Sequence, residues 1–433
     1  MRSISFTYKV ALVFSILAGF CSDGIAQKPS PTPRQEKLLN GMKVLVWNVP
    51  AAEKTTIKIR FHSGSAFDPQ DKEGVMALLS DSFFPTQESR DFFKNELGGS
   101  LDVDCNYDFI QITASAKNSE MLTLLETISQ AVSNPDLGKE AAATLKTALT
   151  LRVSGLATEP AYVADLAVSK RLFGTFPYGR PAEGSIASIQ KIDFADLKYA
   201  KDRLLTSDNA TIAIEGNLDP ALTFRAVRRY FGSWLKADKS IPSTFRQPDP
   251  PEKSPVKIEV PGLTSTEVRY AVRGYSRSSK DFAAAEVLAV ILRSRFADAV
   301  GKSGGTNPVV SHDAHILPGA FVFKYRSSSP VLIIRPDRGD GNQNAVFAAI
   351  YSAPATDVEF AAAKASVLAN AERRDQLQSW LDVDTYKIQS PSDELRAFQA
   401  VDLADVRSLA SKLAAEPVAS AIVTGTAAAT VSN

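Results

Sequence analysis

The apolar residues between positions 74 and 84 recur at helical spacing, and this segment organises the rest of the chain. It reads Gly-Val-Met-Ala-Leu-Leu-Ser-Asp-Ser-Phe-Phe. The spacing predicts a short buried helix, which ends before Pro85 because proline cannot continue the hydrogen-bond ladder. Residues three and four apart are neighbours on a helix, so Ala77, Ser80 and Asp81 share one face of it.

Apolar alternation and short apolar runs predict the strands of the first half, and helical spacing predicts its helices. The predicted strands cover residues 41–48, 55–61, 101–105, 109–114 and 210–215. The predicted helices cover 92–97, 119–132, 137–156 and 161–173. Three carboxylates, on Asp68, Asp71 and Glu73, lie just before the helix of 74–84 or in its first turn, where negative charge suits the helix dipole.

The same order of elements repeats after residues 236–255, a polar stretch with five prolines that we interpret as an interdomain linker. Strands are predicted over 256–260, 267–273, 319–325, 331–335 and 419–424, and helices over 282–300, 344–352, 358–371 and 405–413. This is a duplication with a period of about 200 residues. It predicts an α+β fold of two homologous domains, 38–235 and 256–433, each a mostly antiparallel sheet with helices packed on one face.

The first 26 residues have the features of a secretory signal peptide. Arg2 and Lys9 give a basic start, residues 10–20 are apolar, and Gly24-Ile25-Ala26 suits cleavage before Gln27. A membrane anchor is the alternative, but the apolar run is too short to span a bilayer, and no second stretch reaches that length. We expect a signal peptide over 1–26, a loose leader over 27–37, and a periplasmic or secreted location.

Composition narrows the class of partner. The 433 residues include 49 Lys and Arg against 48 Asp and Glu, and a net charge this close to zero argues against nucleic acid or an anionic membrane. Apolar and charged contents of 44% and 22% are those of a soluble globular protein. After cleavage Cys105 is the only cysteine, so no internal disulfide can form.

The segment 74–84 resembles the zinc helix of the insulinase-like (M16) peptidases, whose inverted H-x-x-E-H motif follows a glycine and two apolar residues. In this register the first histidine falls on Ala77, the glutamate on Ser80 and the second histidine on Asp81. Other matches keep the family's order and spacing. They are Leu39-Asn40-Gly41, Gly98-Gly99, the Phe-Pro-Tyr-Gly-Arg-Pro loop of 176–181, and the strand and turn of 210–219. The chain is therefore similar to a processing-peptidase-like, two-domain member.

The resemblance implies a zinc site whose chemistry is missing here. Zinc catalysis needs three protein ligands and a carboxylate base, whereas Ala77 offers a methyl group and Ser80 a hydroxyl that is too weak a base. Asp81 alone is not a site. The family's third ligand is a glutamate on the helix that here spans 137–156, and the matching stretch 148–152 has none. We therefore expect no catalytic residue, no zinc and no other cofactor.

The family's substrate-handling motifs are also altered. Its peptide-pairing strand matches Leu101, Asp102, Val103, Asp104 and Cys105, with Asp102 and Val103 in place of the expected Asn-Ala. A later Ser-Arg-Leu motif matches Ser294-Arg295-Phe296, and the substrate-holding arginine and tyrosine that follow it in the family fall on Gly301 and Pro308. A shift of a residue or two around Gly304 would change that last match.

Three histidines and the cysteine are better interpreted as structural. His62 follows a predicted strand, and His312 and His315 are three residues apart in a predicted strand or loop. Such a pair shares a metal only on a helical turn, and no third ligand is near in sequence. Cys105 has no histidine at motif spacing, so we expect an inert thiol.

Three hypotheses for the function follow. We favour a non-catalytic homologue that pairs with an active M16 homologue to enclose a peptide or unfolded polypeptide, with no nucleic acid and no membrane span. The second is a stand-alone periplasmic protein that binds peptides or acts as a scaffold. The third is an active metalloendopeptidase with substituted ligands, in which Asp81 acts with Asp71 or Glu73.

Overall fold

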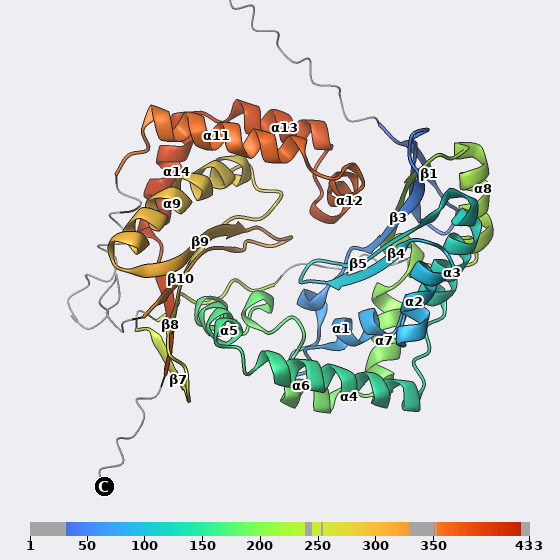
Figure 1. Cartoon of the computed structure of the whole chain (residues 1–433), viewed down its shortest axis with the longest axis horizontal. Coiled ribbons are helices and arrows are strands. Elements are labelled where there is room, and N and C mark those ends of the chain that lie inside the picture. Colours follow the sequence, from blue (N-terminus) through green and yellow to red (C-terminus); the bar gives the residue numbers. More distant parts are fainter. Residues whose placement is uncertain (1–31, 239–244, 253, 329–349, 351–352, 426–433) are drawn as a thin grey trace, which may run out of the picture. The chain divides into compact units, whose positions relative to one another are not determined.

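A computed structural model describes residues 32–238, 245–252, 254–328, 350 and 353–425 (Figure 1). The signal peptide expected over 1–26, the strand expected over 331–335, and nearly all of the helix expected over 344–352 lie outside these residues. Part of the proposed linker also lies outside them. In the described part of the chain, no helix has the length and apolar character needed to cross a membrane.

The first sheet has six strands in the order β1-β2-β6-β3-β5-β4. Their bounds are β1 Arg34–Lys37, β2 Lys43–Asn48, β3 Lys54–Phe61, β4 Ser100–Cys105, β5 Ile110–Lys117 and β6 Ala210–Gly216. Strands β2 and β6 are parallel, and every other neighbouring pair is antiparallel. Residues 34–37, expected to be part of a loose leader, instead form an edge strand on β2. This strand is largely exposed, so it needs no apolar alternation and the sequence pattern misses it.

Eight helices lie in the same half of the described chain, and several of them pack on one face of this sheet. Their bounds are α1 Val75–Asp81, α2 Gln87–Asn95, α3 Met121–Ser133, α4 Lys139–Leu156, α5 Pro160–Phe173, α6 Ile186–Lys191, α7 Phe194–Leu204 and α8 Pro220–Phe231. Helices α1, α2, α3 and α8 contact the strands, while α4 and α7 pack on α1. Together they enclose the apolar core of this half, which includes the buried residues of α1.

The second sheet has five strands in the order β7-β11-β8-β10-β9. Its strands are β7 Val256–Val260, β8 Thr266–Arg273, β9 Gly305–Asp313, β10 Ala320–Ser327 and β11 Val418–Gly425. Only β7 and β11 pair in parallel. The helices are α9 Phe282–Lys302, α11 Asp357–Glu372, α12 Gln376–Tyr386, α13 Pro391–Ala400 and α14 Leu403–Ala415. The predicted α+β class and its duplicated plan of sheet and helices are confirmed.

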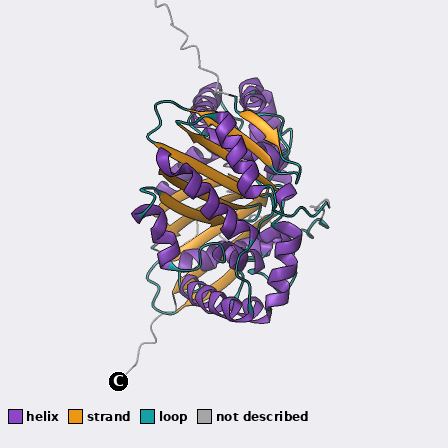
Figure 2. Cartoon of the chain, turned by 90° about the vertical axis from the view of Figure 1, so that its right-hand side faces the viewer, coloured by secondary structure: helices purple, strands orange, loops and turns teal. Residues whose placement is uncertain are grey.

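The second face of each sheet is covered by a helix from the other half of the chain. Leu377 and Leu381 of α12 lie in one apolar cluster with Leu45 and Trp47 of the first sheet. Helix α5 contacts β8 and β11 of the second sheet through residues that include Val168. Strands and helices are therefore layered against one another, as the turned view shows (Figure 2). A sequence pattern that predicts helices on one face does not reveal this exchange.

Candidate functional site

Helix α1 occupies Val75–Asp81, inside the predicted segment, and its six residues 75–80 are all buried. Gly74 precedes it with a φ of 107°, in the region that favours glycine. A Cβ at this position would lie 2.9 Å from the carbonyl oxygen of Glu183. The glycine therefore lets the chain enter the helix against the loop that follows α5.

The carboxylate of Asp68 holds the start of α1. It accepts hydrogen bonds from the amides of Gly74 at 2.7 Å and Met76 at 2.9 Å. Burial raises the pKa of Asp68 to about 7, although these two bonds and the nearby Arg180 act in the opposite direction. Arg180, in the loop 176–181, donates to the carbonyl oxygen of Asp68 at 3.0 Å. The loop 176–181 is therefore tied to the residue that holds the start of α1.

Replacing Asp68 by alanine is expected to lower the free energy of unfolding by about 2 kcal/mol, because two buried amides lose their acceptor. Hydrogen exchange at Met76 should accelerate more than in α14.

The folded pKa of Asp68 lies above the ordinary value of 3.8, so the contribution of Asp68 to stability falls as pH rises from about 4 to 7. Denaturant unfolding of wild type and Asp68→Asn across that range measures it. The exposed cap residue Asp193 supplies the control, and an equal loss in Asp193→Ala would contradict the assignment.

The three positions that correspond to the zinc motif lie together on α1. Ala77 and Ser80 are buried, and the side chain of Asp81 is 21% exposed. Asp81 is bound by both terminal nitrogens of Arg152 on α4, with Nη2–Oδ2 at 3.0 Å and Nη1–Oδ1 at 3.3 Å. The stretch 148–152 therefore does lie against α1, and it supplies a cation where the resemblance places a ligand.

These residues do not fit zinc. A catalytic zinc site needs three nitrogen, sulfur or oxygen donors from the protein, and the only carboxylate in the set is already engaged by a guanidinium. Across the described ranges, no group of three histidine, cysteine, aspartate or glutamate side chains could hold a metal ion. Glu73, a substitute ligand in the third hypothesis, forms an ion pair with Arg180 at 3.6 Å.

Each histidine has partners that hold the fold. His62 lies between the hydroxyls of Thr385 at 2.9 Å and Thr211 at 3.0 Å, and burial lowers its pKa well below 6.5. His312 contacts Glu286 of α9 at 2.9 Å, whereas His315 contacts another carboxylate, that of Asp108, at 2.8 Å. The histidine pair at 312 and 315 is therefore divided between two separate carboxylates.

Strand β4, the expected peptide-pairing strand, lies at the edge of the first sheet and pairs with β5. Leu101, Val103 and Cys105 pack against the core, while Asp102 and Asp104 are exposed. Burial, with help from neighbouring carboxylates, raises the pKa of Cys105 well above its usual value. The thiol is therefore not activated as a nucleophile. Peptide pairing at this edge stays a prediction.

The segment that resembles the second substrate motif makes contacts within the second half of the chain. Arg295, in its Ser-Arg-Phe segment, binds both carboxylate oxygens of Glu359 at 2.7 and 2.8 Å and donates to backbone carbonyls that include Ala353. Gly301 lies in the last turn of α9, and Pro308 lies in the edge strand β9. An edge strand tolerates proline, and β9 includes His312, for which the sequence left strand or loop open.

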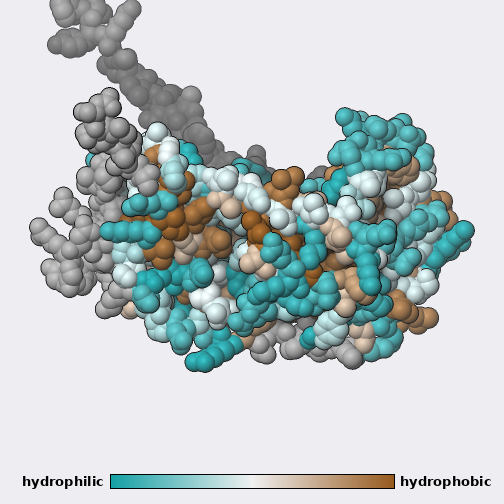
Figure 3. All heavy atoms as spheres, turned by 90° about the horizontal axis from the view of Figure 1, so that it is seen from below, coloured by the Kyte–Doolittle hydropathy of each residue, from teal (hydrophilic) through white to brown (hydrophobic). Residues whose placement is uncertain are grey.

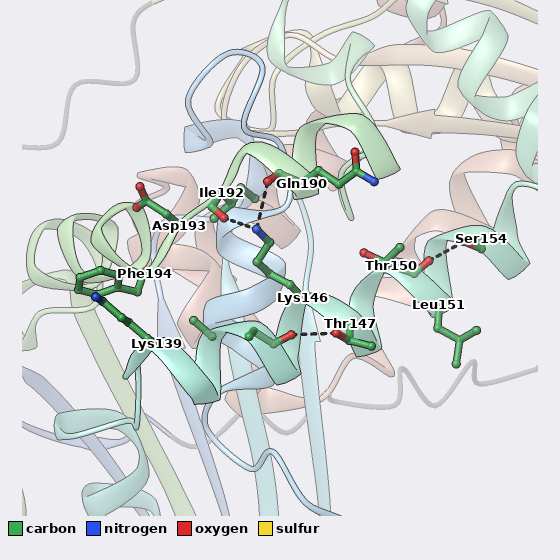
Figure 4. Close-up of a pocket in the computed structure, with 12 residues that line it drawn as sticks. Lys139, Lys146, Thr147, Thr150, Leu151, Ser154, Gln190, Ile192, Asp193 and Phe194 are labelled. Carbon is green, nitrogen blue, oxygen red and sulfur yellow. Dashed lines mark hydrogen bonds between the residues drawn. The ribbon is translucent and has the colours of Figure 1, made fainter.

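A hollow of about 680 Å³ lies against α4, and neither Asp81 nor Arg152 is among the residues that line it. Thr150, Leu151 and Ser154 line it from α4, and Phe194 lines it from α7 (Figure 4). Lys146 crosses it to donate to the carbonyl oxygen of Ile192 at 2.5 Å. Hydrophilic and hydrophobic side chains are mixed when the chain is viewed from below (Figure 3). The hollow is separate from the site that corresponds to the zinc motif.

Two family models match the sequence. The model described as Insulinase (Peptidase family M16) matches residues 43–185, and the model described as Peptidase M16 inactive domain matches residues 191–367. Together they cover most of the chain and follow the order expected from the duplication. The chain therefore belongs to the M16 family of insulinase-like peptidases.

Curated relatives in this family are named as zinc proteases. An uncharacterized zinc protease of Mycobacterium tuberculosis is 23% identical over 209 residues, which are 47% of this chain and 48% of the relative. One from Mycobacterium leprae is 23% identical over 254 residues, 56% of each chain. The chain thus spans about half the length of the curated relatives it matches.

Solved structures of the same fold cover nearly the whole chain. A peptidase M16 inactive domain from Pseudomonas fluorescens has a TM-score of 0.79 at 20% identity, covering 92% of this chain and 99% of its own. A protease from Helicobacter pylori has a TM-score of 0.80 at 14% identity, covering 91% and 100%. A chain of complex III2 from Candida albicans has a TM-score of 0.72 at 17% identity, covering 90% and 95%. These similarities show the fold.

Proposed function

We propose that this chain is a non-catalytic M16 subunit that pairs with an active, zinc-bearing homologue to enclose a peptide. The observation that carries the proposal is the ion pair of Asp81 with Arg152. It occupies the place where the resemblance puts the metal ligands, and the neighbouring Ala77 and Ser80 supply neither a ligand nor a base.

The chemistry of arginine strengthens this argument. A guanidinium keeps its charge at every physiological pH and grips a carboxylate with two parallel N–H groups. A metal ion competing for Asp81 would have to break its two hydrogen bonds with Arg152 and would then lie beside the positive charge of that guanidinium. The pair itself contributes little to stability, because the Arg152 side chain is 47% exposed. Its importance is that it occupies the remaining carboxylate.

The peptide and the partner are inferred from the fold. The edge strand β4 has the geometry for adding a peptide strand through main-chain hydrogen bonds. The fold also occurs in a chain of complex III2, so it is compatible with a place inside a larger assembly. We place the pairing in the periplasm, because the sequence begins with the features of a secretory signal.

The test measures metal, activity and partner on the full mature chain. After dialysis we expect well under one zinc per chain and no chelator-sensitive peptide cleavage, with an M16 homologue carrying intact H-x-x-E-H as the positive control. Mixed with homologues from its own cell, the chain should form a stable complex in size-exclusion chromatography. One equivalent of zinc with chelator-sensitive cleavage would overturn the loss of catalysis. Failure to form any complex would overturn the pairing, and peptide binding by such a chain would favour a stand-alone binding protein.

A variant can test the register directly. The combination Ala77→His, Ser80→Glu, Asp81→His and Arg152→Glu supplies donors at the positions that face one another on α1 and α4. We expect it to bind about one zinc per chain, measured by metal analysis of the folded protein. The same combination with Arg152→Gln is the control and should bind zinc more weakly. Equal zinc contents in the two combinations would show that Arg152 does not face the ligand positions.

A further inference from the structure

Two carboxylates on the edge strand β4 lie outside the ion pairs formed by the described residues. Asp102 and Asp104 are exposed, and neither forms an ion pair with another described residue. Within the described part of the chain, the side-chain amide of Asn106 donates to Asp104 at 3.5 Å. Burial, followed by the nearby Asp102, raises the pKa of Asp104, although the charge of Arg60 and the hydrogen bond of Asn106 act in the opposite direction. A positively charged side chain beside β4 would therefore interact favourably with the carboxylates of Asp102 and Asp104.

The register of the first sheet places two basic residues in the rows that end at these acids. Asp102 is opposite Thr113, which is opposite Lys58, and these three side chains share one face of the sheet. Asp104 is opposite Gln111, and Gln111 is opposite Arg60 in the same way.

Lys58 and Arg60 already form ion pairs with carboxylates from the second half of the chain. Lys58 binds Asp375 at 3.0 Å, and Arg60 binds Asp382 at 2.7 Å. The basic groups of the two rows are therefore paired with carboxylates on α12 and at its N-cap, and the rows end at the edge in acids that form no ion pair with a described residue.

The other face of β4 has the opposite character. Leu101, Val103 and Cys105 alternate with the two acids and pack partly against the apolar core. At an edge, half of the backbone N–H and C=O groups point away from the neighbouring strand and can pair with a new one. A strand added there would place alternate side chains on the acidic face and the rest on the apolar face.

Resting on the proposed peptide-binding function, we propose that the β4 edge accepts an extended peptide in which lysine or arginine alternates with apolar residues. The basic side chains lie against Asp102 and Asp104, and the apolar ones lie beside Leu101, Val103 and Cys105. The charge of the free carboxylates selects a basic occupant over a neutral or acidic one. The spacing of the two acids requires basic residues two positions apart.

The experiment compares labelled eight-residue peptides by fluorescence anisotropy on the full mature chain. Lysine, glutamine or glutamate alternates with leucine in three otherwise matched peptides. We expect the lysine peptide to bind about tenfold more tightly than the glutamine peptide, since two opposite-charge cross-strand pairs form. Its affinity should fall with added salt, and N-methylation of alternate amides should remove binding.

Variants identify the carboxylates. Asp102→Asn with Asp104→Asn should abolish the preference for lysine and leave the glutamine peptide unchanged, whereas Glu88→Gln with Glu96→Gln, which removes two exposed charges from α2 and its end, should preserve the preference. Equal binding of the three peptides, or an unchanged preference in the Asp102 and Asp104 variant, would overturn this inference and leave peptide binding standing. Binding of none of the peptides would also overturn it, while the proposed pairing is judged separately by complex formation.

Discussion

Replacing Asp382 by leucine is expected to lower the free energy of unfolding by about 3–5 kcal/mol, because a buried cation would lose its charged partner. Arg60 is fully buried and binds Asp382 at 2.7 Å, Gln111 at 2.7 Å and Thr385 at 3.1 Å. Its guanidinium also lies 3.9 Å from the centre of the Phe109 ring. The remaining neutral partners cannot replace a carboxylate.

Denaturant unfolding measures the loss, and hydrogen exchange should show it first in α12. The combination Arg60→Met with Asp382→Leu should recover part of the stability, since both charges of this pair are then gone, while Arg277, which lies 3.8 Å from Asp382, keeps Glu394 as a partner. Asp202→Asn is the control, because it removes a surface ion pair with Lys198. The side chains of Asp202 and Lys198 are 52% and 69% exposed, so this change should cost less than about 1 kcal/mol. A loss of that small size in Asp382→Leu would mean that the buried pair does not hold α12.

Asp108→Asn is expected to cost about 3 kcal/mol, because this buried carboxylate has several donors at once. It accepts from His315 Nδ1 at 2.8 Å and from the amide of Ile316 at 3.1 Å. The hydroxyls of Tyr178 and Tyr386 lie 3.4 Å away. Asparagine has one acceptor oxygen instead of two and no charge. The midpoint of denaturant unfolding at pH 6 measures the change.

The contact between Asp108 and His315 also makes the stability of the fold depend on pH. Burial acts to lower the pKa of His315, but the hydrogen bond and charge of Asp108 outweigh it and raise the pKa above 6.5. The stabilising charge is therefore fully present below pH 6.5 and is lost as pH rises through the folded pKa. Wild type should lose stability over that window, and Asp108→Asn should lose much less. An identical slope in the two proteins would exclude His315 as the source.

Local sequence gives much of the fold. The strands at Lys43–Asn48 and Lys54–Phe61, and helices such as α4 and α9, were predicted because each buries one face or both and its spacing repeats over several residues. Helix α12 was missed for a physical reason: Asp382 and Thr385 are buried with its leucines, so polar side chains interrupt its apolar stripe.

The candidate site divides in the same way. The sequence by itself predicted the buried helix that carries Ala77, Ser80 and Asp81 on one face, and its resemblance to the M16 zinc motif predicts that these residues stand at the places of the ligands and base. Only the tertiary structure decided that Arg152 forms an ion pair with Asp81 and that β4 is an edge strand with two exposed carboxylates. It also decided that Lys58 and Arg60 pair with carboxylates on α12 and at its N-cap. Those pairings join residues far apart in the chain, and no local pattern carries the distance between their side chains.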